Sequence, residues 1–196
     1  MDRLRQQIDF ILEIDNLKHI LRRSKVTDGS RRENDVEHSW HLAVMVMLLA
    51  EYAPEPIDVL RTAKMVLIHD IVEIDSGDTF VYSTAAREAA HEIEQTAADR
   101  LFGMLPADQA SEVRALWDEF EARVTPEARF ARALDRLQPI MLNYANHGGP
   151  WREHNITAEQ VMSLNMPILR DGAPGLAEFA AKLFLEAQEK GYFHEE

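Results

Sequence analysis

The chain has 196 residues, of which 46% are hydrophobic and 28% charged, so it holds enough apolar mass for one globular domain. Its formal net charge of −13 argues against sequence-independent binding to DNA or RNA, which requires a basic surface. Because the chain contains no cysteine, disulfides, thiol nucleophiles and cysteine-ligated zinc are excluded. Imidazole and carboxylate groups are the remaining candidates for metal ligation.

The sequence predicts no targeting or membrane segment. The N-terminus lacks the apolar core of a signal peptide. The longest apolar run, residues 42–50, is too short to span a bilayer. We therefore expect a cytoplasmic protein without a membrane partner.

Apolar residues recur with helical periodicity along most of the chain. Residues 22–35 and 77–84 lack this periodicity and are expected to be loops, and no β pattern is evident. Prolines and capping residues, such as Thr125 followed by Pro126, mark the expected helix starts. The predicted helices are 3–21, 36–52, 57–75, 85–105, 106–123, 125–146, 157–168 and 174–191. The pattern indicates an all-α fold of roughly eight helices packed at varied angles.

Three polar residues gather at the end of the apolar helix predicted over residues 57–75. His69 and Glu73 are four residues apart, and Asp70 and Glu73 are three apart, so a helix would place all three on one surface. An imidazole and two carboxylates suit a divalent transition metal. The alternative is a polar helix end, in which His69 caps carbonyl groups and the carboxylates are solvated.

Two further candidate ligands lie far from this stretch. His38 stands at the start of the apolar helix over residues 36–52, where a single histidine often serves as a cap or a core hydrogen-bonding group. Asp135 lies among apolar residues, where an unpaired buried carboxylate would be costly. Metal ligation would satisfy Asp135, and so would an ion pair with Arg132 or Arg136.

The combination of these residues is more specific than any one of them. The order of His38, His69-Asp70 and Asp135, with each member on its own predicted helix, resembles the HD-domain superfamily of metal-dependent phosphohydrolases. The resemblance covers roughly residues 20–147. It implies an HD-domain helical fold with a metal site in the core, in a single domain over residues 1–196. The helices over residues 157–191 are then expected to pack on the motif-bearing core.

The resemblance also implies a ligand set and a family branch. His38, His69, Asp70 and Asp135 are expected to bind one divalent metal, and the nitrogen ligands favour Mn, Co, Fe, Ni or Zn over Mg or Ca. Residues 37–39, 133–139 and the run from Glu73 to residues 77–78 are similar to the branch that contains the 5′-deoxynucleotidases.

Three residues are expected to act on substrate. Glu73 matches the family's catalytic carboxylate, which faces the metal-bound water; its alternative is a surface helix residue. Asp78 matches a carboxylate at the reaction centre that contacts the sugar hydroxyl; its alternative is turn chemistry after Gly77. Arg23 stands where the branch has a phosphate-binding arginine; its alternative is a favourable charge at a helix C-terminus, a role that suits Arg22 equally well. Ser24 departs from the aromatic residue found there in the bacterial deoxynucleotidases, which puts strict deoxynucleotide specificity in question.

The resulting functional hypothesis is a metal-dependent phosphomonoesterase. Its substrate is expected to be a nucleoside 5′-monophosphate, including 5′-deoxynucleotides, which it cleaves to nucleoside and phosphate. The family resemblance also implies a homodimer. Two alternatives stay open: an HD-type hydrolase of another small phosphoester, and a non-catalytic helical interaction module.

Overall fold

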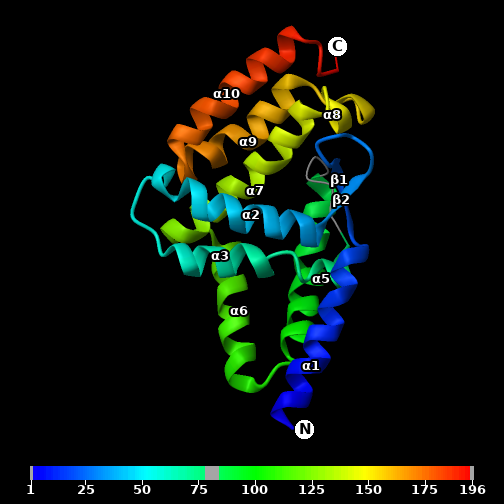
Figure 1. The fold of residues 1–196 in the computed structure, drawn as a ribbon, viewed down its shortest axis with the longest axis vertical. Coiled ribbons are helices and arrows are strands. Elements are labelled where there is room, and N and C mark those ends of the chain that lie inside the picture. The colour runs from blue at the N-terminus through cyan, green and yellow to red at the C-terminus, as the bar shows by residue number, and fades with distance from the viewer. Residues whose placement is uncertain (1, 78–83, 195–196) are drawn as a thin grey trace.

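The computed structural model describes residues 2–77 and 84–194, and these form a helical protein with one small antiparallel hairpin (Figure 1). The all-α class predicted from the sequence is confirmed. In chain order the elements are α1 (Arg3–Glu13), the 3₁₀ helix η1 (Ile14–His19), β1 (Leu21–Lys25), β2 (Arg32–Asn34), α2 (Asp35–Leu49), the 3₁₀ helix η2 (Ala50–Tyr52), α3 (Val59–Ile68), α4 (Glu73–Ser76), α5 (Thr84–Phe102), α6 (Ala107–Ala122), α7 (Pro126–Ala145), α8 (Gly149–Glu153), α9 (Ala158–Gly172) and α10 (Pro174–Glu189). Among the described residues, no helix is both long and apolar enough to cross a membrane.

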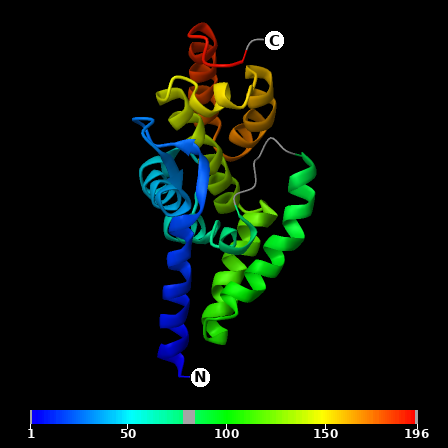
Figure 2. The same cartoon turned by 90° about the vertical axis from the view of Figure 1, so that its right-hand side faces the viewer.

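Helix α7 lies at the centre of the arrangement. It contacts α2, α3, α6, α9 and α10, and Figures 1 and 2 show it passing between the C-terminal helices and the α5–α6 pair. The helix begins sharply because the Thr125 side chain accepts a hydrogen bond from the Ala128 amide and Pro126 occupies the first turn. More than half of its residues are buried, so α7 presents side chains to neighbours on several sides.

The apolar interior is divided into two clusters. The larger one joins α2, α3, α7, α9 and α10, and the smaller one joins η1, α5 and α6. The segment between α3 and α4 links them, since Val66 belongs to the larger cluster whereas Ile71 and Val72 belong to the smaller. His69 and Asp70 therefore lie at the junction of the two clusters, anchored by apolar neighbours on both sides.

The expectation of a loop over residues 22–35 is wrong, because β1 and β2 form an antiparallel hairpin there. The inward-facing residues of the hairpin are polar: Ser24 and Glu33 are buried, and Arg22 is nearly so. A strand with polar residues on its inner face shows no apolar alternation, which is the pattern that identifies a strand in a sequence. The hairpin is instead held by polar contacts with the rest of the protein.

The expected helix over residues 57–75 is interrupted, and the one over residues 3–21 ends early, at Glu13, where η1 begins. Helix α3 ends at Ile68, and bonds from the Ile71 amide to the Ile68 carbonyl and from the Glu73 amide to the Asp70 carbonyl tighten the next turn. Neither glycine nor proline marks this break in the sequence. His69 and Asp70 therefore lie in a tight turn between α3 and α4.

Candidate metal centre

The first turn of α2 positions His38. A capping box fixes the helix start: Asn34 Oδ1 accepts from the Glu37 amide at 3.0 Å, and Glu37 Oε2 accepts from the Asn34 amide at 3.2 Å. One turn into the helix, the His38 side chain is completely buried. The sequence thus fixes both the start of the helix and the direction of its first imidazole.

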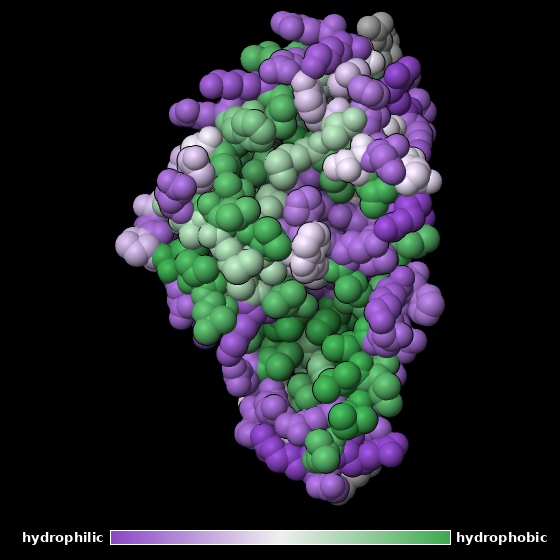
Figure 3. Space-filling model, in the orientation of Figure 1, coloured by the Kyte–Doolittle hydropathy of each residue, from purple (hydrophilic) through white to green (hydrophobic). Residues whose placement is uncertain are grey.

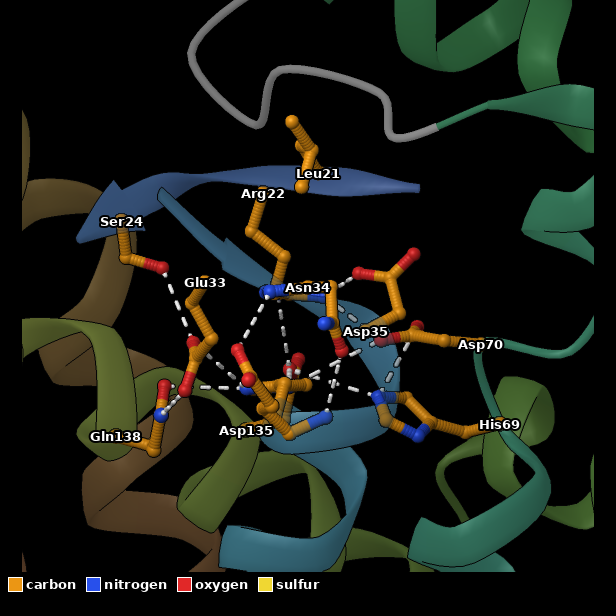
Figure 4. Close-up of polar contacts among 12 residues, drawn as sticks. Leu21, Arg22, Ser24, Glu33, Asn34, Asp35, His69, Asp70, Asp135 and Gln138 are labelled. Atoms are coloured by element: carbon orange, nitrogen blue, oxygen red, sulfur yellow. Dashed lines mark hydrogen bonds and ion pairs between the residues drawn. The ribbon is translucent and has the colours of Figure 1, made fainter. Parts of the chain in front are cut away.

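Side chains from three separate parts of the chain converge at one point (Figure 4). His38 Nε2 lies 3.1 Å from Asp135 Oδ1, and His69 Nε2 lies 3.7 Å from the same oxygen. Asp70 Oδ1 is 3.0 Å from His69 Nε2, and the opposite Asp70 oxygen is 3.9 Å from His38 Nε2. All four residues are buried. The structure therefore brings together the four side chains that the sequence singled out as ligands.

Both histidines direct their Nε2 atoms into the cluster. The Nδ1 of His38 lies 3.1 Å from the Gln138 side-chain oxygen, and the Nδ1 of His69 lies 2.9 Å from the Val66 carbonyl. A carbonyl or amide oxygen only accepts, so each Nδ1 carries the proton and each Nε2 presents a lone pair in the neutral ring. Metal-ligating histidines are oriented in this way by a partner on the other nitrogen.

One donor atom each from His38, His69 and Asp135 lies close enough to the other two to share a single cation, and Asp70 adjoins this group through one oxygen near each histidine. Ligand atoms about 2.0–2.2 Å from an ion and at right angles to one another lie about 3 Å apart. The observed separations, from 3.0 to 3.9 Å, run from this value upwards. In addition, His69 Nε2 is a buried atom without a hydrogen bond, because its close approach to Asp70 lacks hydrogen-bond geometry. An ion shared by these atoms would satisfy it.

Burial disfavours the charged form of each of these groups, yet the two carboxyls stay ionised. Burial alone would raise the pKa of Asp70 and Asp135, but the neighbouring histidines and arginines outweigh it and hold both pKa values below the usual range. Burial and the charge of Arg22 lower the pKa of His38 to about 4. Burial also lowers the pKa of His69, but the charges of Asp70 and Asp135 prevail and raise it to about 10. The cluster therefore presents two anionic carboxylates, a neutral His38 and a protonated His69, and a metal ion would take the place of the His69 Nε2 proton.

Arg22 also reaches this cluster from strand β1. Its guanidinium donates to Asp70 at 2.7 Å and to Asp35 at 3.1 Å, and lies 3.9 Å from Asp135 Oδ1 (Figure 4). Sequence reasoning missed this residue, because residue 22 was assigned to a loop that follows a helix. Arg22 and Ser24 share one face of the strand, but this spacing points to Arg22 only once the hairpin is known.

A second polar network supports the cluster from behind. Gln138 donates to Glu33 at 2.7 Å and lies 3.2 Å from His41 Nδ1, while Ser24 donates to the other Glu33 oxygen at 3.3 Å. Burial raises the pKa of Glu33, and these hydrogen bonds partly offset that effect. Because Gln138 also contacts His38, the network ties the hairpin to the imidazole.

Two of the remaining predicted site residues line a cavity of about 380 Å³ that opens onto the cluster. Glu73, the first residue of α4, lines the cavity, and one of its oxygens lies within 4.8 Å of ligand atoms of Asp35 and Asp70. Arg23 lines the cavity as well, although it faces the opposite side of the strand from Arg22 and is exposed. Asp78 lies outside the described residues.

The cavity differs in charge from the chain as a whole. Although the formal net charge is −13, the described lining carries as many arginines as carboxylates. The arginines stand at positions 22, 23, 123, 132 and 136. A bound dication would make the cavity net positive, which suits a small anionic ligand.

Taken together, the fold and the cluster define a helical protein with a buried histidine–carboxylate centre of the metal-binding type, open to a ligand-sized cavity. The family model described as HD domain matches residues 14–177. The chain belongs to the HD-domain family. The four residues of the cluster are those whose order along the chain carries the resemblance described in the sequence analysis.

The most informative similarities are to a crystal structure and to curated relatives. A predicted metal-dependent phosphohydrolase from Magnetospirillum magnetotacticum is 52% identical, with a TM-score of 0.93, covering 98% of this chain and 96% of that chain. Human 5′-deoxynucleotidase HDDC2 is 28% identical over 138 residues, covering 70% of this chain and 66% of the relative. The chain thus spans just under two thirds of the length of that relative. An HD-domain phosphohydrolase from Listeria innocua, at 16% identity and a TM-score of 0.61, shares the fold.

Proposed function

We propose that this chain is a metal-dependent phosphohydrolase that releases phosphate from nucleoside 5′-monophosphates, including 5′-deoxynucleotides. The observation that carries the proposal is the convergence of two imidazoles and two ionised carboxylates at the wall of a cavity sized for a small ligand. The similarity to a 5′-deoxynucleotidase and to a predicted phosphohydrolase supports the same reaction class.

His38, His69, Asp70 and Asp135 would hold one divalent ion. Two nitrogen and two oxygen donors favour Mn, Co, Fe, Ni or Zn. When bound, such an ion supplies Lewis acidity towards a phosphate oxygen and a water of lowered pKa. The hydrogen bonds from the histidine Nδ1 atoms to Gln138 and Val66 keep both rings oriented for this task.

Glu73 is the proposed proton-transfer residue. It stands at the start of α4, beside Asp70 and on the cavity wall, where it reaches the space in front of the ligand cluster. A carboxylate in that position can accept a proton from the attacking water and return one to the leaving oxygen. We keep Asp78 as a proposed contact to the sugar, on the basis of the family resemblance.

Arg23 is the proposed phosphate-binding residue, because it lines the cavity and stands at the position that the family resemblance gives to a phosphate-binding arginine. A guanidinium on the cavity wall can hold two phosphate oxygens at once. Ser24 is buried and donates to Glu33, so no aromatic group at this position bars a ribose hydroxyl. We therefore expect both ribonucleotides and deoxyribonucleotides to be substrates.

Replacing Arg23 with alanine should lower kcat/KM for a nucleoside monophosphate by about 10–100-fold, the value of a charged hydrogen bond. The effect should lie mainly in KM, and metal content should be unchanged. Steady-state phosphate release and elemental analysis measure both quantities. Arg31→Ala is the matched control, since Arg31 pairs with Glu37 on the exposed side of the hairpin and should leave turnover unaffected. Normal kinetics in the Arg23 variant would remove this residue from the substrate site.

A substrate panel tests the function itself. Phosphate release is measured from ribo- and deoxyribonucleoside 5′-monophosphates with Mn, Co or Mg, and with EDTA. Chelator-sensitive release from at least one nucleotide supports the proposal. Phosphate release only from other phosphoesters favours a different small substrate. Purified protein that contains no metal and releases no phosphate favours an interaction module.

We also propose a homodimer. Several of the exposed large apolar side chains lie on α1, α2 and α3, and Figure 3 shows apolar surface gathered over these helices. Leu12, Leu48 and Leu60 are each at least 65% exposed. Extended apolar patches of this kind mark protein interfaces more often than free surface. Light scattering on the eluting protein would give a mass near that of one chain if the proposal is wrong.

A further inference from the structure

A second group of metal-ligating side chains lies apart from the cluster described above. His91 and Glu94 are three residues apart on α5, so helical geometry places them on the same face. Glu121, near the end of α6, supplies a third ligand, and the second carboxylate, from the neighbouring helix, which contacts α5 (Figure 2). One ligand atom from each of the three lies within 4.8 Å of the other two.

The surroundings of this group favour a cation. All three residues line the same cavity as the first cluster, so their ligand atoms are accessible from solvent. Burial, followed by the like charge of Glu121, raises the pKa of Glu94. Glu121 is paired with Arg123, whose Nη2 lies 3.6 Å from Glu121 Oε2, and Arg132 is paired with Asp135 at 3.0 Å. A cation between Glu94 and Glu121 would relieve a repulsion that the arginines only partly offset.

We propose that His91, Glu94 and Glu121 form a second divalent-cation site. One nitrogen and two oxygen donors suit a first-row transition ion such as Co²⁺, Ni²⁺ or Zn²⁺. Three protein ligands leave coordination positions for water or for an oxygen of a molecule in the cavity, as in sites that keep an open position. The site shares no residue with the first cluster, so its binding of metal does not depend on the proposed reaction.

Cobalt binding to the full-length protein tests the site. The metal-free protein is dialysed against Co²⁺, and bound cobalt is measured together with its visible absorption bands. The wild type should bind two ions per chain, and the double variant His91→Ala/Glu94→Gln should bind one and lose one set of bands. The matched control is Glu92→Gln, because Glu92 is an exposed carboxylate on the same helix and should leave both ions in place.

Comparison with a variant of the first cluster separates the two proposals. His69→Ala should lose the other ion and keep the bands that depend on His91. A wild type that binds one ion, unaffected by the His91→Ala/Glu94→Gln change, would overturn the second site and leave the first intact. A single ion that disappears with His91 but survives His69→Ala would establish the second site and remove the basis of the proposed function. Glu121→Gln, on the opposite helix, repeats the test should the double variant not fold.

Discussion

Asp135→Asn should reduce the affinity for the catalytic metal by roughly 100-fold or more, beyond the effect expected from losing a residue that only orients a ligand. Asp135 is the shared acceptor of the cluster, because one of its oxygens lies near both His38 Nε2 and His69 Nε2. Asparagine has nearly the same volume and keeps one acceptor oxygen, but it removes the charge that helps to attract a dication. Nucleotide hydrolysis should fall in parallel with metal content.

Elemental analysis after dialysis and phosphate release give the two readouts for Asp135→Asn. Asp108→Asn serves as the control, since Asp108 is an exposed residue of α6 whose partner is Arg3. Thermal unfolding of both variants without metal checks that the fold is retained. If the Asp135 variant retains metal and turns over at the wild-type rate, the four residues do not form the catalytic centre.

The long helices could be predicted because the hydrophobic residues in them follow the helical repeat. In α2 and α7 the buried positions are mostly apolar and recur at helical spacing, so the sequence alone indicates both elements. The capping residue Thr125 even gives the start of α7 to within one position. Where apolar side chains occupy the buried positions, the hydrophobic pattern of the sequence is sufficient to predict the helix.

The hairpin could not be predicted in this way, because its buried face is polar. Glu33 and Ser24 hydrogen-bond to each other, and Glu33 accepts a further bond from Gln138, which is more than a hundred residues away in sequence. Such an arrangement is stable only because each buried polar group finds its partner in the folded chain. No local pattern in residues 21–34 carries that information.

The position of Arg22 follows from the same limitation. Once the hairpin is in place, the strand directs Arg22 towards the carboxylates of Asp35 and Asp70, whereas Arg23 faces away. An arginine buried among carboxylates compensates their negative charge, which would otherwise be buried without a cationic partner. The candidate ligands were identifiable from their order along the chain, but the residue that balances their charge was not.

The break between α3 and α4 alters how Glu73 reaches the site, but Glu73 still lines the cavity. A continuous helix would have placed His69 and Glu73 one above the other, but the turn after Ile68 puts Glu73 at the start of a separate short helix. The Glu73 amide donates to the Asp70 carbonyl, which places the start of α4 directly after Asp70, and the Gly77 amide donates to the Glu73 carbonyl at the end of the helix. The proximity of the carboxylate therefore arises from the tight turn rather than from helical spacing.

Glu73→Gln should lower kcat by about 10²–10⁴-fold, the usual contribution of a positioned general acid or base. Glutamine keeps the size of the side chain and its hydrogen-bonding capacity, but it cannot take up a proton at neutral pH. Because Glu73 is not one of the four proposed ligands, the amount of bound metal should equal that of the wild type, and KM should change little.

The pH profile distinguishes this role from a structural one. If Glu73 accepts the proton of the attacking water, the acidic limb of the wild-type kcat profile should be absent in Glu73→Gln. Asp75→Asn is the control on the same short helix, since Asp75 pairs with Arg100 at the surface and should leave both limbs in place. A Glu73 variant that loses metal along with activity would make the residue a ligand, and one with normal turnover would leave proton transfer to another group. Only loss of turnover with retained metal and a missing acidic limb identifies Glu73 as the residue that moves the proton.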